Sequence, residues 1–178
     1  MLDLVLGKFR PAESRPLPLF LTFSVVMLVL RLLLAQPFWR SGLTRWVDFP
    51  AGYLTKLASS TKLIFANEFK LHFFWGEMPI PFPEVVGYMT AAFEILLPII
   101  IVLGLLTRLG ALGLLAMTCV IQLVYPDALI NTYDPMNSHL LWMAYAVVII
   151  VCGPGLFSVE GLLRRFALYR RPARSSTP

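Results

Sequence analysis

Long apolar stretches with few charged residues are the feature that most constrains this chain. Leu17 to Gln36 is about 20 mostly apolar residues, and at 1.5 Å rise per residue a helix of that length crosses a hydrocarbon core of about 30 Å. Phe82 to Tyr125 is too long for one span, and a turn at Thr107-Arg108-Leu109-Gly110 divides it in two. The sequence predicts four membrane-spanning helices, at about 17–36, 84–106, 109–126 and 139–157.

The composition supports a protein whose surface faces lipid. Hydrophobic residues make up 58% of the 178 residues and charged residues 14%, whereas a soluble domain carries about a quarter of charged residues. We therefore expect an all-α membrane protein, a four-transmembrane-helix bundle. It forms one membrane domain over 17–163, between a basic head at 1–16 and a basic tail at 164–178.

The net charge of +5 is concentrated at the ends of the apolar stretches. This pattern orients membrane proteins and argues against a nucleic-acid partner; the lipid bilayer is the expected partner. The head, the turn at Arg108 and the tail all carry basic residues, whereas 127–138 carries none. Because basic residues near span ends favour the cytoplasm, both termini are predicted to be cytoplasmic and 37–81 periplasmic.

The segment 37–81 is predicted to be helical and amphipathic, at the surface of the membrane. Five apolar residues near its start share one helical face. They are Phe38, Trp39, Leu43, Trp46 and Val47. This helix either lies in the membrane–water interface or extends the first span and packs on its neighbours. The aromatic-rich stretch from Thr61 to Trp75 predicts an interfacial or partly re-entrant cap, which the prolines after Met78 bring to an end.

Each predicted span contributes one polar residue, and these are Arg31, Glu94, Gln122 and His139. An ionisable side chain inside a span costs about 2.5–3.5 kcal/mol and therefore needs a reason. Helix rise places Arg31 roughly 21 Å and Glu94 roughly 18 Å above the cytoplasmic side, with the other two near the same level. Two interpretations stay open: a structural Arg31–Glu94 pair with Gln and His hydrogen bonds, or a pocket open to the outer leaflet that binds a polar head group such as a quinone.

Other chemical signals are weak. Met136 and Met143 share a predicted helical face with His139, which suits a soft metal such as Cu(I), but methionine more often fills gaps in packing, and no metal site is predicted. Cys119 and Cys152 are expected to be packing residues without a disulfide. The sequence contains no phosphate-binding loop, nucleophile elbow or HExxH motif, so no catalytic residue is predicted.

Several short motifs occur in an order that resembles the DoxX family. They are Arg31 followed by Phe38–Arg45, then Ala92-Phe93-Glu94, Leu103–Arg108, Ala116-Met117-Thr118 with Gln122, His139–Trp142 and Gly153–Glu160. The sequence departs from the family at Arg45, where many relatives carry Lys, and at Glu160, where they usually carry Asp. The resemblance implies a four-helix bacterial inner-membrane protein. The family takes its name from a subunit of an archaeal thiosulfate:quinone oxidoreductase, and other members are linked to redox-stress complexes or accompany peptide clusters for copper handling.

Two functions follow as hypotheses. The first is a membrane subunit of a redox system that binds quinone or a redox partner, with Arg31 and Gln122 as hydrogen-bond donors and Glu94 or His139 passing protons. The second is a non-catalytic anchor or assembly factor for an operon-encoded redox or copper-handling protein, which would dock on 37–81 or on the basic tail.

Overall fold

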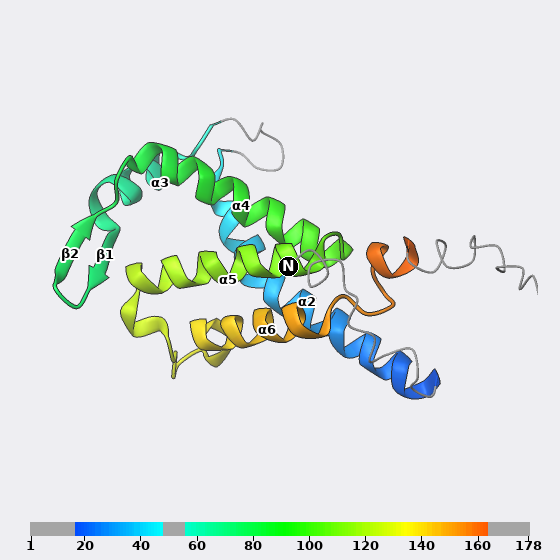
Figure 1. Ribbon diagram of the computed structural model, residues 1–178. Helices are drawn as coiled ribbons and strands as arrows, with labels where there is room; N and C mark the ends of the chain where they lie inside the picture. The colour runs from blue at the N-terminus through cyan, green and yellow to red at the C-terminus, as the bar shows by residue number, and fades with distance from the viewer. Residues whose placement is uncertain (1–16, 48–55, 164–178) are drawn as a thin grey trace, which may run out of the picture.

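The computed structural model describes residues 17–47 and 56–163 (Figure 1). The predicted basic head at 1–16 and the tail at 164–178 lie outside the described residues. The described part is mainly helical. Its elements are α2 (Leu17–Arg45), α3 (Ser59–Leu63), a π-helical turn η1 (Ile64–Glu68), β1 (Lys70–Phe73), β2 (Gly76–Pro79), α4 (Pro83–Leu103), α5 (Thr107–Val124), two short 3-10 turns (Pro126–Ala128 and Pro135–Asn137) and α6 (His139–Cys152).

Three of these helices are long and apolar enough to cross a membrane: α2, α4 and α5. They contain 29, 21 and 18 residues, or about 43, 31 and 27 Å. The predicted spans at 84–106 and 109–126 correspond to α4 and α5. The fourth helix is shorter than the predicted 139–157: α6 has 14 residues and ends at Cys152, because Gly153 has a φ of +82° and Pro154 follows it.

The first helix is longer than predicted. α2 continues from Leu17 through Pro37 to Arg45, so of the two alternatives for the helix that starts at residue 37, the structure shows the extension of the first span. Of the predicted apolar face, Phe38 in α2 and Trp46 just after it are buried, whereas Trp39 and Val47 are exposed. An internal proline is tolerated in a membrane helix where neighbouring groups satisfy the freed carbonyl.

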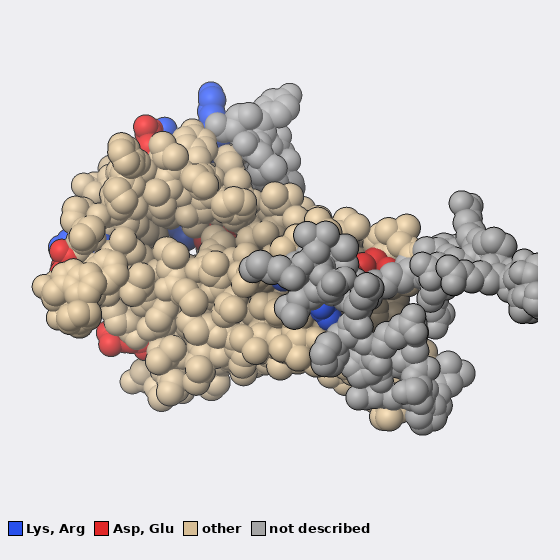
Figure 2. Space-filling model, in the orientation of Figure 1, with Lys and Arg blue, Asp and Glu red and all other residues tan. Residues whose placement is uncertain are grey.

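Four helices pack together around a common core. α2 contacts α4 and α6, and α5 contacts the same two helices; Figure 1 shows α4, α5 and α6 side by side, with α2 crossing them at an angle. The buried side chains of this core include Met27, Leu34, Phe38, Ile101, Leu114 and Ile149. The outer surface of the helices is largely uncharged, and Figure 2 shows Lys, Arg, Asp and Glu gathered mainly toward its edges.

The segment between α2 and α4 is a mixed cap and not the amphipathic helical segment predicted over 37–81. After α3 and η1, β1 and β2 form an antiparallel hairpin with Lys70 opposite Pro79 and Phe73 opposite Gly76. Aromatic residues favour strands because they fit a pleated, half-buried surface. Lys70 and Glu77 form an ion pair across the hairpin, with Nζ and Oε2 3.1 Å apart.

The turn between α4 and α5 depends on Gly104, which has a φ of +70°. An added Cβ would overlap the Arg31 guanidinium and the Ser158 Cβ, and would lie 3.0 Å from the Ser158 Cα. Both the backbone conformation and the space around it therefore require glycine at this position.

Gly104→Ala is expected to lower the free energy of unfolding by about 2 kcal/mol or more, because it adds left-handed backbone strain to a clash with the Ser158 backbone. Gly87→Ala in α4 is the matched control. Its Cβ would meet the Phe65 ring at an ordinary 3.5 Å, so stability should be unchanged or slightly higher. Thermal unfolding of both variants in detergent measures the difference, and equal midpoints would contradict the role of Gly104.

Candidate functional site

The main polar site within the helices is an ion pair between α2 and α4. The Arg45 Nε lies 3.1 Å from Glu94 Oε2, and the Arg45 Nη2 donates to Glu94 Oε1 at 3.4 Å. The same Nη2 lies 3.4 Å from the Ser41 hydroxyl oxygen. The Glu94 side chain is 2% exposed and that of Arg45 is 18% exposed. A two-bond arginine–carboxylate contact of this kind fixes both position and orientation.

Gly42 allows α2 and α4 to approach closely beside the Arg45–Glu94 ion pair. A Cβ on Gly42 would lie 3.0 Å from the Glu94 carbonyl carbon and oxygen and 2.8 Å from the Ile95 Cδ1. The absence of a side chain therefore lets α2 approach the α4 backbone closely. Arg45 follows Gly42 by three positions, and side chains at that spacing share one helical face.

Two phenylalanines of the cap cover the ion pair. The Phe65 and Phe69 ring centroids lie 5.5 and 5.9 Å from the Arg45 Cζ, within the range of cation–π attraction. The two rings pack edge-on to each other at 4.9 Å. Phe65 belongs to the π-helical turn η1, a local geometry that occurs frequently at functional sites. The charged pair therefore has an aromatic cover from a different part of the chain.

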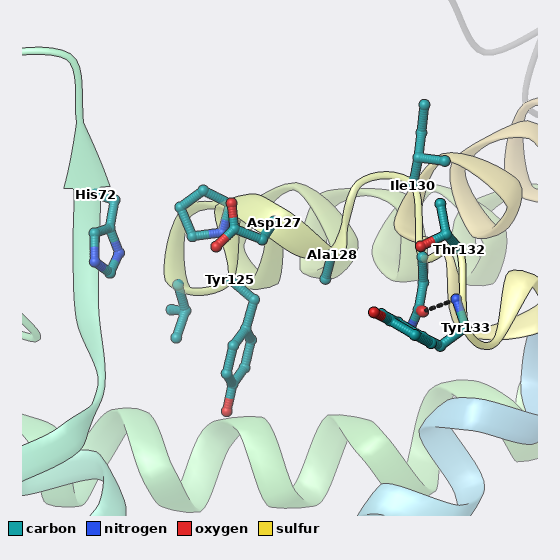
Figure 3. A pocket seen from close by; sticks show the side chains of 10 residues that line it. His72, Tyr125, Asp127, Ala128, Ile130, Thr132 and Tyr133 are labelled. Atoms are coloured by element: carbon teal, nitrogen blue, oxygen red, sulfur yellow. Dashed lines mark hydrogen bonds between the residues drawn. The ribbon is translucent and has the colours of Figure 1, made fainter.

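Tyr125 connects this cover to an open pocket. Its ring packs edge-on against Phe69 at 5.6 Å. Burial raises the pKa of its hydroxyl, and the charge of Arg45 opposes that effect. Figure 3 shows the Tyr125 ring pointing away from Asp127 and Ala128 toward α4.

The pocket itself has a volume of about 540 Å³ and lies between the hairpin and the chain that follows α5. Its lining is mixed polar and apolar. It consists of His72, Val124 to Ala128 and Ile130 to Tyr133.

Gln122 and His139 are brought together as a second polar pair. The Gln122 Nε2 donates to the Pro126 carbonyl at 2.7 Å, which leaves its Oε1 as the acceptor 2.6 Å from the His139 Nδ1. The His139 Nδ1 therefore carries the proton in this arrangement. The pair holds the turn from α5 into Tyr125 and Pro126, beside the pocket.

Arg31 lies elsewhere, at the opposite end of α4 from the hairpin. It is fully buried, and its Nη1 lies 3.5 Å from the carbonyl oxygens of Ile101 and Val102. Its Nη2 donates to the Phe157 carbonyl. Carbonyls in the last turn of a helix lack partners within the helix and carry partial negative charge, so they stabilise a buried cation.

The predicted Arg31–Glu94 pair is therefore wrong, because Glu94 pairs with Arg45. The predicted heights of Arg31 and Glu94 are measured from the cytoplasmic end of each predicted span, but α2 is about 43 Å long and crosses α4 at an angle. Arg31 consequently meets the end of α4, and Arg45 meets its middle. Of the four predicted residues, only Gln122 and His139 contact each other.

Sequence reasoning missed Arg45, Ser41, Phe65, Phe69 and Tyr125 as members of a site. Arg45 could have been found, because it is a basic residue at the end of an amphipathic helix and belongs to one of the motifs resembling the DoxX family. The phenylalanines carried no such signal, since their role depends on how the cap folds over α2.

Residues that could hold a metal are not gathered in the described part of the chain. Among residues 17–47 and 56–163, no group of three or more His, Cys, Asp and Glu is placed to bind an ion. Met136 lies in the 3-10 turn before α6 begins, so it does not share a helical face with His139. Cys119 and Cys152 are free and exposed, not buried packing residues.

The Arg45–Glu94 pair should be strongly coupled in stability. Arg45→Gln is expected to cost about 3–5 kcal/mol, because it leaves the buried Glu94 without its partner, and Glu94→Gln less, because Arg45 is 18% exposed; the double variant should recover part of the loss. Unfolding of the three variants in detergent measures the coupling energy. The exposed pair of Lys62 with Glu84 serves as the control and should show little coupling. Additive losses at Arg45 and Glu94 would contradict the pairing.

A sequence model of the DoxX family matches residues 26–127, more than half of the chain. The matched region contains α4, α5 and the Arg45–Glu94 pair. No curated protein and no solved structure matches the chain. The family match agrees with three apolar helices of membrane-spanning length. The chain belongs to the DoxX family, and it is an integral membrane protein of that type.

Proposed function

We propose that this protein is a membrane subunit of a redox system that binds a quinone head group at the Arg45–Glu94 site. The observation that carries the proposal is a buried ion pair between two helices of membrane-spanning length, covered by two phenylalanines. Charged groups inside membrane helices are rare and mark functional sites by default. This pair is covered by a cap and not by lipid.

The chemistry of the site suits a quinone. A quinone head group is a flat ring with carbonyl oxygens that accept hydrogen bonds. The guanidinium of Arg45 is a planar donor with several N–H groups, and it is partly exposed at 18%. The Phe65 and Phe69 rings offer apolar faces for the ring of the ligand.

Glu94 gives the site a group that exchanges protons. Reduction of a quinone to a quinol takes up two electrons and two protons. The electrons would come from a partner oxidoreductase, and Glu94 would pass protons to an oxygen that Arg45 holds. Tyr125 lies between the aromatic cover and the open pocket, on the side from which water would supply those protons.

The other predicted residues take supporting roles in this proposal. Gln122 and His139 orient the turn that carries Tyr125, through the bond from Gln122 to the Pro126 carbonyl. Arg31 is a structural contact at the far end of α4 and is not part of the binding site.

We also propose that 139–157 crosses the membrane as a fourth span, with both termini in the cytoplasm of a bacterial inner membrane. α6 alone is about 21 Å long. The chain after Gly153 continues against α2, where the Leu156 amide donates to Ser24 Oγ and the Phe157 carbonyl accepts from Arg31. Non-helical backbone is tolerated at membrane depth when protein groups satisfy it.

Quinone binding is expected to depend on the ion pair. The double variant Arg45→Gln/Glu94→Gln leaves no uncompensated charge, so it should fold, yet its affinity for a short-chain quinone should fall about tenfold or more, because the charged donor is lost. Titration of the purified protein in nanodiscs, followed by calorimetry, measures the affinity. Arg40→Gln, an exposed arginine on the same helix, is the matched control and should bind as the wild type does.

Unchanged affinity in the folded double variant would refute the site. If the wild-type protein binds no quinone and instead co-purifies with a redox or copper-handling partner, the protein is an anchor or assembly factor, and the proposed function is wrong.

A further inference from the structure

The turn of the β1–β2 hairpin is made of aromatic residues. Phe74 and Trp75 connect the two strands, and their exposed fractions are 96% and 65%. Two-residue hairpin turns usually consist of Gly, Asn or Asp. Leaving a side chain of this size in water forgoes about 1.5–3 kcal/mol of burial. An apolar tip of this kind indicates a surface that is covered by something other than water.

The rings at the tip are ordered against one another. The Phe73 and Trp75 rings stack in parallel at 4.9 Å, and the Phe74 and Trp75 rings meet edge-on at 4.3 Å. The tip is thus one continuous aromatic surface. Each ring alone would be an ordinary exposed residue, but three in contact form a patch.

The hairpin is amphipathic. Side chains alternate between the two faces of a strand, so Lys70 and His72 share one face, together with Glu77, which lies opposite His72. Lys70 and His72 both approach Glu77, at 3.1 and 3.5 Å. Leu71 and Phe73 occupy the other face. The charges therefore pair with one another on one face, and the apolar face continues into the tip.

The position of the hairpin places it at the edge of the bilayer. The His72 Nδ1 lies 3.2 Å from the Leu123 carbonyl in the last turn of α5, and β2 ends shortly before α4 begins at Pro83. α4 and α5 are about 31 and 27 Å long, close to the hydrocarbon thickness of about 30 Å. The ends of these helices therefore mark the membrane–water boundary. Figure 1 shows the hairpin lying across them.

We propose that the aromatic tip, Phe73, Phe74 and Trp75, inserts into the boundary between the lipid head groups and acyl chains and anchors this end of the protein in the bilayer. Two observations select lipid over a protein partner. The hairpin lies at the ends of two helices of membrane-spanning length, and exposed apolar side chains lie near those same ends, Val85 in the first turn of α4 and Val120 in the last two turns of α5. Aromatic residues concentrate at this depth in membrane proteins.

Site-specific labelling tests the proposal. Phe74→Cys, in a protein with Cys119 and Cys152 replaced by Ser, carries an environment-sensitive fluorophore in vesicles of phosphatidylcholine and phosphatidylglycerol. Its emission should shift to shorter wavelength, and spin-labelled lipids with the label near the head group should quench it about threefold more than the same fluorophore at Glu77→Cys, on the charged face. Both sites are exposed, so the fold should survive labelling.

A tip that aqueous iodide quenches as strongly as position 77, without quenching by the labelled lipids, overturns the proposal. The same is true if the tip becomes protected only when a second protein is reconstituted with the chain. Neither result depends on quinone binding, so the anchor and the proposed function fail independently.

Discussion

Two arginines set the register between α2 and α4, and most of the structure depends on that register. Arg31 meets the carbonyls at the end of α4, and Arg45 meets Glu94 near its middle. The arginines are 14 positions apart on α2 (45 − 31), or about 21 Å, whereas Glu94 and Ile101 are 7 positions apart on α4 (101 − 94), or about 11 Å. The unequal spacing agrees with the angle at which α2 crosses the other helices in Figure 1. The cap contacts α2 at Arg45, and the C-terminal segment contacts it at Arg31.

Arg31 also organises the end of the protein opposite the hairpin. Through the Phe157 carbonyl it draws the chain after Gly153 onto α2, and the Glu160 amide donates to the Gly104 carbonyl in the α4–α5 turn. These bonds satisfy backbone groups that lie outside regular helix, which matters because unpaired groups in hydrocarbon are costly. Gly104 belongs to the same arrangement, since any side chain there would occupy the place of the Arg31 guanidinium. One buried cation thus joins three segments that are distant in sequence.

The sequence was sufficient to predict α4 and α5, because the length and continuity of an apolar stretch depend only on local composition. It also indicated Glu94, Gln122 and His139 as polar residues within the predicted spans, but not that Gln122 and His139 bond to each other. The partner of Glu94 could not be predicted, since helix rise gives a height along one axis but neither the tilt of α2 nor the face it presents. The hairpin was missed for a related reason: residues 69–75 are aromatic in a pattern that suits either an interfacial helix or a strand, and packing against the end of α5 decides between them.

The surroundings of the Arg45–Glu94 pair suit more than a structural cross-link between α2 and α4. A buried ion pair adds little stability compared with apolar residues of the same size, because desolvation offsets the attraction. A structural role alone therefore gives a weak reason to keep two charges between membrane helices. The helices α2 and α4 do not enclose the pair completely, because Arg45 remains 18% exposed. The rings that cover Arg45 belong to Phe65, in the π-helical turn η1, and to Phe69, which follows that turn. A short cap segment can shift at lower cost than a packed helix, because fewer buried contacts hold it. A charged pair with a partly open donor and a cover from a separate short segment can fix the register of α2 on α4 and, in the function we propose, also admit a flat polar ligand.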